Sequence, residues 1–531
     1  MAAVLLAVAM LIGCFGLSSS GPLWPDGAQY ANAGAMFHDL LSSGAILSPY
    51  EFAKQNYARY PAFHLPYHPP VYPALLGVFF LFTGVSYTAA RIFIALCLWA
   101  SGCFFNGILR RSGVSAGAAF GCSLLLLTTP QIAFWSRDSM SEIPGLALVL
   151  AGTYCFVRWL ASPRYWLYAA AFVFAEAAFL SRFLTAGVVP AWFLLLLSAG
   201  QFRRLRAPSL LIPPAVYGLV SCGWVVMVRH WARYETGSGP VINYAGPFSW
   251  KLIAFYAPAI PSMVGWTVLS CAIVGLVMSL RSLPKQSLWL WWIASYSIFI
   301  WGVGIYSEER YLFYLLPVFP ALAAPLLELR WVTSPSYRRL AAALVLFACF
   351  VENVGTITAF PRGVVGYETV GKYLAGLTRP GNILVYSAEQ AHLIFQYRAS
   401  EPMLARSFIR GDRTLAVRAP AYTAQPTVVV AQSTVDVVDI IRRGRIRYIV
   451  TSHVGRVDEV PPPELTLLQQ ALNSRADLFR KLSEFPLRKQ YSSTVESVTV
   501  SVWEYTGVLR SGPSEIPIQI PTADMTVQDS R

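Results

Sequence analysis

The acidic residues Asp26 and Glu142 are the first candidates for chemistry in this chain. Each lies at the edge of a long apolar block, where acids are few. An ionisable group held against an apolar environment is costly, and such groups are functional candidates by default. A carboxylate there can take the proton of an attacking hydroxyl, so both residues are candidate catalytic groups. Each can also serve only its own helix, because an acid near a helix N-terminus is favourable for backbone reasons alone.

Asp138 lies one helical turn before Glu142 and competes with it for the role of second acid. The cations that could bind an anionic substrate group are Arg310, Arg182 and Arg137, of which Arg310 is the strongest candidate. The guanidinium group suits phosphate oxygens because it donates several hydrogen bonds in a fixed planar fork. The alternative for Arg310 is a local ion pair with the two glutamates that precede it.

Aromatic and histidine side chains accompany these charges. Tyr30 follows the first acid by about one helical turn and could help to lower the local dielectric. His68 stands before a pair of prolines, where it could contact a phosphate or a sugar, or simply belong to a turn. His64 lies four positions earlier, but Pro66 between the two histidines argues against a pair of metal ligands on one helix face. Nothing in the sequence indicates a metal or another cofactor.

The composition fits a membrane protein. Of the 531 residues, 55% are hydrophobic and 13% are charged, and the mean hydropathy is +0.50. An ordinary soluble domain has about 25% charged residues, so a simple soluble enzyme, a disordered chain and a fibrous protein are excluded. The net charge of +14 does not indicate nucleic acid, because the basic residues sit in short loops between apolar blocks. The eight cysteines fall in apolar blocks without CxxC spacing, so there is no disulfide or zinc motif.

About eleven apolar blocks follow one another up to residue 360, and each is close to the roughly 20 residues that cross a bilayer as a helix. The sequence therefore predicts a mainly α-helical, polytopic membrane domain over residues 1–360. Arginine-rich short loops alternate with loops that are poor in cations, which places the N-terminus in the cytoplasm and everything after 360 outside the inner (plasma) membrane. The blocks are 1–17, 88–109, 115–134, 143–160, 165–181, 183–198, 208–228, 258–280, 286–304, 311–328 and 339–358.

Two regions are expected on the outer face. The loop 18–87 should hold an amphipathic helix at 28–41 and a helix at 71–82 that is too short to span and fits the membrane interface. Residues 361–508 predict a small α/β domain, and 509–531 predict a disordered tail. The expected strands of this domain are 383–387, 393–397, 427–431, 448–452 and 498–505, and its expected helices are 366–377, 435–443 and 464–485.

An outward-facing site restricts the donor of any group transfer. ATP and nucleotide sugars are scarce outside the cytoplasm, and the sequence has no P-loop, GxSxG, HExxH or strand-linked GxGxxG motif. A donor carried in the membrane, such as a polyprenyl phosphate sugar, meets this restriction. Its leaving group is an anionic lipid phosphate that needs cations, and its acceptor hydroxyl needs a base.

Several short motifs occur in a telling order: Trp24-Pro25-Asp26 with Tyr30 and Ala33, His68-Pro69-Pro70 with Tyr72-Pro73, Ala90-Arg91, Ser141-Glu142-Ile143-Pro144, and Arg310-Tyr311 with Leu316-Pro317. This order resembles the bacterial integral-membrane glycosyltransferases of the GT-C fold. The closest group is that of families 39 and 83, which holds protein O-mannosyltransferases and lipid A aminoarabinose transferases. The resemblance covers roughly residues 1–330.

The resemblance implies that Asp26 is the catalytic aspartate of the first loop and Glu142 the acid of the second loop. It also implies a polyprenyl-phosphate-linked sugar as donor and transfer with inversion. The chain departs from the family pattern at two places. Gly27 follows the first acid, where a glutamate is often found, and Tyr67-His68 stands where the aminoarabinose transferases carry a Glu-Lys pair. The second departure leaves phosphate binding to arginine or histidine.

We therefore expect a glycosyltransferase that moves one sugar to an acceptor hydroxyl on the outer face of the lipid bilayer. The acceptor could be a protein, a glycolipid or a polysaccharide. Two other classes stay open. A transporter or flippase for a lipid-linked sugar would need paired half-helices or inverted repeats near the bilayer midplane. A non-catalytic membrane scaffold would use the outer α/β domain as its binding module.

Overall fold

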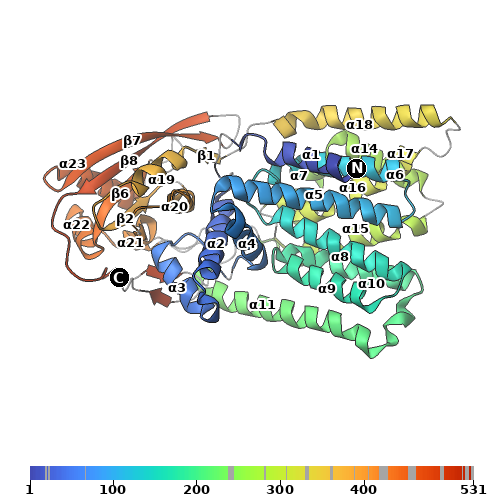
Figure 1. Ribbon diagram of the computed structural model, residues 1–531, viewed down its shortest axis with the longest axis horizontal. Coiled ribbons are helices and arrows are strands. Elements are labelled where there is room, and N and C mark those ends of the chain that lie inside the picture. The colour runs from blue at the N-terminus through green and yellow to red at the C-terminus, as the bar shows by residue number, and fades with distance from the viewer. Residues whose placement is uncertain are drawn as a thin grey trace.

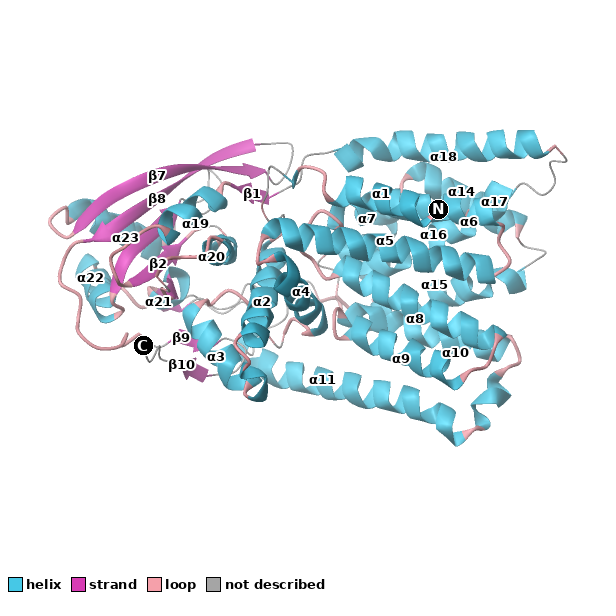
Figure 2. Ribbon diagram, viewed as in Figure 1, coloured by secondary structure: helices cyan, strands magenta, loops and turns pink. Residues whose placement is uncertain are grey.

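The computed structural model has two parts, a helical bundle and a mixed sheet covered by helices (Figures 1 and 2). The bundle is built from the first two thirds of the chain, and the sheet from the last third. The structure describes residues 1–531 except 18–20, 22–23, 66, 237–243, 280–282, 306–307, 329–333, 359–362, 388, 405, 418–427, 453–461, 491–494, 517, 521–524 and 528–531.

Within the described residues, five helical segments are long and apolar enough to cross a membrane. They are α5 (Tyr87–Arg111), α8 (Glu142–Ala161), the segment Pro208–His230 that includes most of α11 (Ile212–Thr236), the segment Glu309–Glu328, and α18 (Pro335–Thr358). A sixth candidate is a broken pair, Trp250–Val264 and α14 (Trp266–Met278), which bends by 102°. These segments confirm the polytopic membrane class that the composition predicts.

Shorter helices occupy the remaining apolar blocks. They are α1 (Ala2–Gly13), α6 (Ala116–Thr128), α7 (Pro130–Trp135), α9 (Tyr165–Phe179), η3 (Phe183–Val188), α10 (Val189–Ser198) and α15 (Leu283–Val303). The segment Glu309–Glu328 is made of η8 (Glu309–Leu315), α16 (Val318–Leu322) and α17 (Ala324–Glu328), and the broken pair contains α12 (Trp250–Tyr256) and α13 (Ile260–Val264). Every predicted block is thus helical, and the number of eleven spans stays a prediction.

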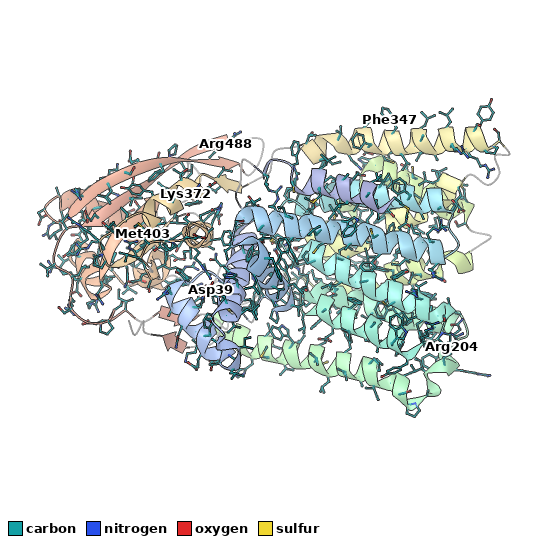
Figure 3. The ribbon with its side chains drawn as sticks, in the orientation of Figure 1. Asp39, Arg204, Phe347, Lys372, Met403 and Arg488 are labelled. Atoms are coloured by element: carbon teal, nitrogen blue, oxygen red, sulfur yellow. The ribbon has the colours of Figure 1, made fainter. Side chains whose placement is uncertain are left out.

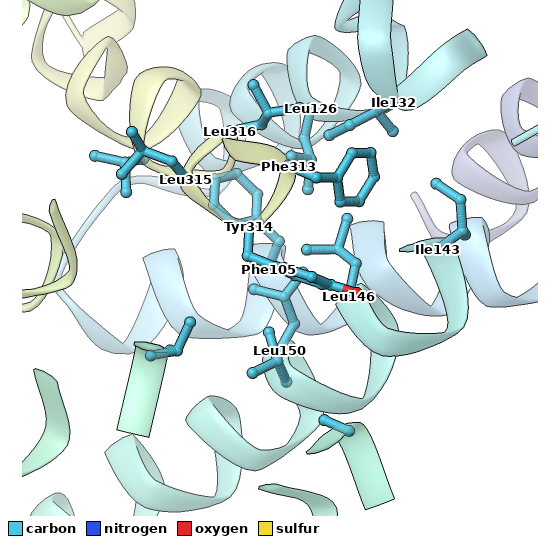
Figure 4. Packing of buried hydrophobic residues seen from close by; sticks show 14 of the residues in the cluster. Phe105, Leu126, Ile132, Ile143, Leu146, Leu150, Phe313, Tyr314, Leu315 and Leu316 are labelled. Carbon is cyan, nitrogen blue, oxygen red and sulfur yellow. The ribbon is translucent and has the colours of Figure 1, made fainter. Parts of the chain in front are cut away.

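One continuous apolar core joins the bundle. Figure 4 shows side chains of α5, α6, α7, α8 and η8 packed together, among them Phe105, Leu146 and Phe313. The last two of these elements begin at or beside candidate site residues, Glu142 and Arg310. Burial of these apolar side chains therefore fixes where the two charged residues lie, since close-packed cores leave little freedom.

The break between α13 and α14 has a specific partner on α18. Gly265 lies at the break with a φ of 93°, a conformation that suits glycine. Glu352 of α18 accepts hydrogen bonds from the amides of Trp266 (2.6 Å) and Thr267 (2.7 Å). A carboxylate at this place satisfies two of the backbone donors that a helix N-terminus leaves free. Glu352 thus has a structural role.

Three α-helices lie between α1 and α5 in the chain: α2 (Pro25–Ser42), α3 (Pro49–Arg59) and α4 (Val71–Thr83). Helix α2 begins with Pro25 in its first position and is followed by Gly44 at φ 71°, the two signals expected at a helix start and end. Helix α4 starts after two prolines and is followed by Gly84 at φ 75°. The predictions of helices at 28–41 and 71–82 are correct, whereas α3 was not predicted.

The last third of the chain forms a six-stranded mixed sheet in the order β1-β7-β8-β6-β2-β3. The three strands at one side, β6, β2 and β3, pair in parallel, and the pairs formed by β8 and β7 are antiparallel. The strands are β1 (Gly363–Val365), β2 (Asn382–Tyr386), β3 (Phe408–Arg410), β6 (Ile446–Ser452), β7 (Phe479–Gln490) and β8 (Val495–Tyr505), with a separate short pair β4 (Ala416–Val417) and β5 (Val428–Val429).

Helices cover both faces of this sheet. Because successive side chains of a strand point to opposite faces, Ile383 of β2 packs with α19 (Tyr367–Ala375) and α20 (Gln390–Ala399), and Leu384 packs with the helices on the other face. The helices on that face are α22 (Thr434–Arg443) and α23 (Pro463–Ser474), and the short α21 (Gly411–Thr414) follows β3. The predicted α/β domain is correct in class.

Three local predictions for this domain are wrong. Residues 393–397 lie in α20, because a short apolar run fits a buried helix as well as a strand. The predicted helix 464–485 ends at Ser474, and its second half belongs to β7, which pairs along its length with β8. The tail 509–531 contains two paired strands, β9 (Ile518–Ile520) and β10 (Met525–Val527), where disorder was expected.

The sheet domain contacts α2 through polar side chains. Arg398 of α20 donates to the carbonyl of Asn32 (3.1 Å) and to the carboxylate of Asp39 (2.8 Å), both on α2. The Asn32 amide group in turn donates to the carbonyl of Ala391 (2.8 Å). Figure 3 shows Asp39 between the bundle and the sheet domain. The domain therefore rests on the helix that begins beside Asp26.

Candidate active site

Arg310 brings the two candidate acids together. Its Nη2 donates to Asp26 Oδ2 at 3.1 Å, and its Nη1 lies 3.8 Å from Glu142 Oε1. Asp26 stands in the first turn of α2, Glu142 begins α8, and Arg310 lies near the start of η8. Residues far apart in the sequence thus meet where three helical elements begin.

Arg182 completes this group of charges. Its Nη2 lies 3.0 Å from Glu142 Oε1, and its side chain is 8% exposed. The residue lies in the turn between α9 and η3, so the two apolar segments around it form a hairpin with Arg182 at its tip. The sequence prediction that Asp26, Glu142, Arg310 and Arg182 form one site agrees with this arrangement.

Glu308 is a member of the site that the sequence suggested only as a local partner of Arg310. Its two carboxylate oxygens contact Nε and Nη2 of Arg310, so the pair is bidentate. This is the geometry in which a guanidinium group also holds a phosphate. A glutamate two positions before a candidate phosphate-binding arginine could have been suspected of occupying the same donors.

Two tryptophans flank the Arg310 guanidinium. Its central carbon lies 5.8 Å from the ring centroid of Trp24 and 5.6 Å from that of Trp135. The two rings touch each other edge to face, with centroids 5.8 Å apart. A cation between aromatic faces is attracted to both, so these rings restrict where the guanidinium can lie. Trp135 was missed from the sequence because it comes from α7, and no local motif links it to Arg310.

Tyr30 and His68 form a second layer beside the charges. Their rings stack with centroids 4.4 Å apart and an interplanar angle of 16°. Ser141 donates its hydroxyl to the Tyr30 hydroxyl at 3.1 Å, which links α2 to the residue before Glu142. His68 reaches the site from the turn before α4, and it is only 7% exposed. Both predicted residues therefore lie at the site.

The electrostatic environment keeps Asp26 ionised. Burial raises its pKa, but the charges of His68, Arg310 and Arg182 outweigh burial and hold the pKa below its ordinary value. Burial also lowers the pKa of His68 to about 4, so His68 is neutral at pH 7 and the two arginines then supply the stabilising charge. Burial raises the pKa of Glu308, and the charge of Arg310 opposes it.

Several polar atoms of the site have bonding capacity left. Nη1 of Arg310 and Nε of Arg182 are buried, and neither donates a hydrogen bond to any described residue. Neither oxygen of Glu142 accepts a hydrogen bond with good geometry from the described residues. Because buried polar groups are normally satisfied, these donors and acceptors suit a ligand with anionic and hydroxyl groups.

Asp138 lies beside the start of α2, and both of its carboxylate oxygens accept hydrogen bonds from backbone amides. Its Oδ2 accepts a hydrogen bond from the Trp24 amide at 2.9 Å, and its Oδ1 accepts one from the Ser139 amide at 2.6 Å. The residue is fully buried. Burial raises its pKa to about 7, although the amides of Ser139 and Trp24 favour the charged form. Of the two acids that compete for the second role, Glu142 is the one beside Arg310.

Arg137 points elsewhere. Its guanidinium donates to the carbonyls of Ile357 (3.2 Å) and Thr356 (3.1 Å) near the end of α18. Cations near a helix C-terminus are favourable because the last carbonyls carry partial negative charge. We therefore assign Arg137 to the packing of α18 and not to substrate binding.

No metal cluster is evident in the described part of the chain, where no three His, Cys, Asp or Glu side chains gather closely enough to hold an ion. Two arginines instead offset most of the negative charge of the site. Arg182 and Arg310 face three carboxylates, those of Asp26, Glu142 and Glu308. The arrangement can hold an anionic group and present a carboxylate to a hydroxyl.

Comparisons with known proteins agree with the fold. Residues 67–227 match the family model "Dolichyl-phosphate-mannose-protein mannosyltransferase". A comparison with curated protein sequences gave no match. The structure is similar to that of ArnT from Cupriavidus metallidurans bound to undecaprenyl phosphate, with a TM-score of 0.57, 15% identity, and coverage of 94% of this chain and 97% of that one.

Two further solved structures are similar. The apo state of the same ArnT gives a TM-score of 0.57 at 14% identity, with coverage of 94% and 97% of the two chains. The Archaeoglobus fulgidus oligosaccharyltransferase in its apo form gives 0.51 at 11% identity, with coverage of 85% of this chain and 69% of that one. With a family match in the membrane part and these structural similarities, the chain is a polytopic membrane protein of the GT-C glycosyltransferase fold.

Proposed function

We propose that this protein is a glycosyltransferase that moves a single sugar from a polyprenyl-phosphate-linked donor to an acceptor hydroxyl. The observation that carries the proposal is the junction of Asp26, Glu142, Arg182 and Arg310, which combines an ionised carboxylate with buried, incompletely bonded guanidinium groups. Transfer from a lipid phosphate needs this combination, because a proton must leave the acceptor while negative charge develops on the phosphate. ArnT, which has the same fold, has been solved with undecaprenyl phosphate bound.

In this proposal Asp26 is the general base. Arg310 holds Oδ2, and no described residue donates a hydrogen bond to Oδ1, which is left for the acceptor hydroxyl. The hydroxyl oxygen forms a bond to the anomeric carbon as the bond from that carbon to the phosphate oxygen breaks. The proton passes to Asp26, and the electron pair of the broken bond leaves with polyprenyl phosphate. A single displacement of this kind inverts the anomeric configuration.

Arg310 and Arg182 hold the phosphate in this proposal. A lipid phosphate would use the Nη1 of Arg310 and the Nε of Arg182, and it would compete with Glu308 for the other donors of Arg310. Glu142 keeps Arg182 and Arg310 in place and offers its oxygens to hydroxyl groups of a substrate.

We place the reaction on the outer face of the inner membrane. Arg204, which lies in one of the arginine-rich loops, is at the end of the bundle away from the sheet domain (Figure 3). The positive-inside rule assigns that end to the cytoplasm. The site and the sheet domain then face outward, where a protein, a glycolipid or a polysaccharide can serve as acceptor.

A lipid-linked sugar transporter and a non-catalytic scaffold are the alternatives. One broken span, at α13 and α14, is present among the described helices, and inverted-repeat transporters use broken helices in pairs. A scaffold would not require an arginine held between three carboxylates. Neither alternative has a specific observation in its favour.

The test uses the purified full-length protein in lipid nanodiscs and a panel of polyprenyl phosphate sugars, with a soluble hydroxyl acceptor present. We expect one donor to be cleaved, with release of polyprenyl phosphate and formation of an inverted glycoside. Movement of labelled donor across vesicles containing the protein, without bond cleavage, would contradict this function. If removal of residues 365–531 ended the cellular role while Asp26→Asn did not, the scaffold would replace the enzyme.

A further inference from the structure

The N-terminus of α2 has no capping side chain of its own. Trp24 is the N-cap residue, and its side chain accepts no hydrogen bond from the first turn. In a capping box, the acid at the third helical position bonds back to the amide of the N-cap residue. Counting from Trp24, the third position of α2 is Gly27, which has no side chain. The helix that carries Asp26 therefore lacks the local means to satisfy the Trp24 amide.

Asp138 supplies that bond from the second outer loop. The Trp24 amide donates to Asp138 Oδ2 at 2.9 Å, across 114 positions of sequence. A Cβ atom built on Gly27 would lie 2.2 Å from Asp138 Oδ1. The carboxylate of Asp138 thus occupies the space that a side chain at position 27 would enter, so residue 27 and Asp138 exclude each other.

Another helix of the same chain shows the local form of this bond. Helix α22 has Ser433 as its N-cap residue and Asp436 at its third position, and the two form a complete capping box. The Ser433 amide donates to Asp436 Oδ2 at 2.9 Å, the same length as the bond from Trp24 to Asp138. The same contact with the N-cap amide is therefore made at both helices, from within the helix in one case and from a distant loop in the other.

We propose that Asp138 is a positioning residue that provides the missing carboxylate of the α2 capping box and thereby fixes Asp26 relative to Glu142. Its second oxygen accepts the Ser139 amide, so one side chain holds the start of α2 and the loop that leads into α8. Ser139 continues the connection through its hydroxyl, which lies 2.8 Å from that of Tyr72 on α4. The inference depends on the proposed function only for its kinetic measurements.

This role accounts for the glycine after Asp26. A glutamate at position 27 could serve the capping box directly, but it would meet the Asp138 carboxylate in the same space. The chain has the acid on the other loop instead. Removal of the acid at position 138 should therefore loosen the start of α2, and a new acid at position 27 should restore it. Acids at both positions should destabilise the start of α2 more than a single acid at either position.

The experiment compares four full-length proteins: wild type, Asp138→Ala, Gly27→Glu and the double variant. Hydrogen exchange is measured in the peptide that spans Trp24 to Ala28, together with kcat and KM for the donor. We expect each single variant to exchange at least about 10-fold faster and to lose on the order of 10- to 100-fold in kcat with a smaller change in KM, because displacement of a reacting group by about 1 Å has costs of this size. The double variant should recover most of both losses.

Asp436→Ala is the matched control, because it removes the same kind of contact from α22 in the sheet domain. It should speed exchange at α22 and leave exchange at α2 and kcat unchanged. The proposal is overturned if exchange at α2 and kcat of the double variant are no closer to wild type than those of Asp138→Ala. A general structural loss would not be rescued by an acid at position 27. If Asp138→Ala does not accumulate, accumulation of the double variant is the rescue, and its failure to accumulate overturns the proposal.

Exchange does not depend on catalysis, so the two hypotheses can fail separately. A wild-type protein that cleaves no donor but shows the expected exchange pattern would remove the proposed function and leave this positioning role intact. If wild type cleaves the donor and α2 of Asp138→Ala exchanges as slowly as α2 of wild type, the proposed function stands and the positioning role of Asp138 is overturned.

Discussion

The guanidinium of Arg310 lies 3.1 Å from Asp26 although 284 positions separate the two residues in the chain. This ion pair joins the first turn of α2 to η8, near the end of the membrane bundle in the sequence. Asp26 is 22% exposed and Arg310 is 7% exposed, so the pair is partly shielded from water. A partly buried carboxylate that is held by one oxygen and open at the other is suited to accept a proton from a substrate.

Replacement of Asp26 by asparagine should remove the base and keep the shape. We expect kcat to fall by a factor on the order of 10² or more, because general base catalysis contributes about this much. The measurement is release of polyprenyl phosphate by the purified variant. Glu51→Gln on α3, where the native side chain is 59% exposed, is the control and should keep full activity. An asparagine variant near the wild-type rate would rule out the base assignment.

Glu308→Gln should strengthen binding of the donor. Glu308 occupies two donors of Arg310, and an uncharged amide competes less well with a phosphate for them. We expect KM for the donor to fall by about 3-fold or more, which corresponds to a modest fraction of one charge-assisted hydrogen bond. Glu309→Gln at the next, exposed position should leave KM unchanged. A higher KM in Glu308→Gln would show that Glu308 helps to bind the donor.

His68 should make the fold sensitive to mild acid. Its pKa is about 4 in the folded protein because of burial, against about 6.5 in an unfolded chain. Between these values the unfolded state binds more protons, so stability is present above about pH 6.5 and is lost as the pH falls towards 4. The full effect is about 3 kcal/mol. The groups that face His68 are Asp26, Arg182, Arg310, Tyr30, His64 and Tyr67.

His68→Phe tests this prediction because it keeps a ring to stack on Tyr30 and removes the titrating group. Thermal unfolding of the detergent-purified proteins is followed from pH 4.5 to 7.5. The difference in stability between the variant and wild type should grow in favour of the variant as the pH falls. His38→Gln, at a histidine that is 26% exposed, is the control. A difference independent of pH would contradict the burial of a neutral His68.

Arg398 and Asp39 should be energetically coupled across the two parts of the protein. Their ion pair spans 2.8 Å, with Arg398 5% exposed and Asp39 39% exposed. Because one partner is open to water, we expect a coupling on the order of 1 kcal/mol and not more. A double-mutant cycle with Arg398→Ala and Asp39→Ala, read by hydrogen exchange of α20, measures it. Lys372→Ala, in an exposed pair on α19, should have no effect on α20.

Local sequence signals predicted the parts of the site that depend on single helices. Pro25 and Pro144 mark the first turns of α2 and α8, so the positions of Asp26 and Glu142 at helix starts could be inferred from the chain alone. Hairpin geometry between two apolar segments placed Arg182 at the same end of the bundle. These inferences succeed because helix ends and apolar periodicity depend on neighbouring residues.

Sequence signals could not predict contacts whose partners come from distant segments. The sequence makes both Arg137 and Arg310 candidates for binding an anion, with Arg310 the stronger. In the structure Arg137 binds carbonyls at the end of α18, and Arg310 lies between Asp26 and Glu142. Residues 393–397 have an apolar run that fits either a strand or a helix, and packing against α19 and the sheet decides for a helix. No window of sequence contains this information.

The sequence by itself determined that this is a polytopic membrane protein with an α/β domain after it. It also determined which acids stand at helix starts, because apolar length and helix capping are local properties. Only the tertiary structure decided which of Asp138 and Glu142 faces Arg310, and that the space beside Gly27 is taken by Asp138. Both facts depend on tertiary packing, because packed helices bring distant loops together. The packing therefore decides which group lies next to a buried charge.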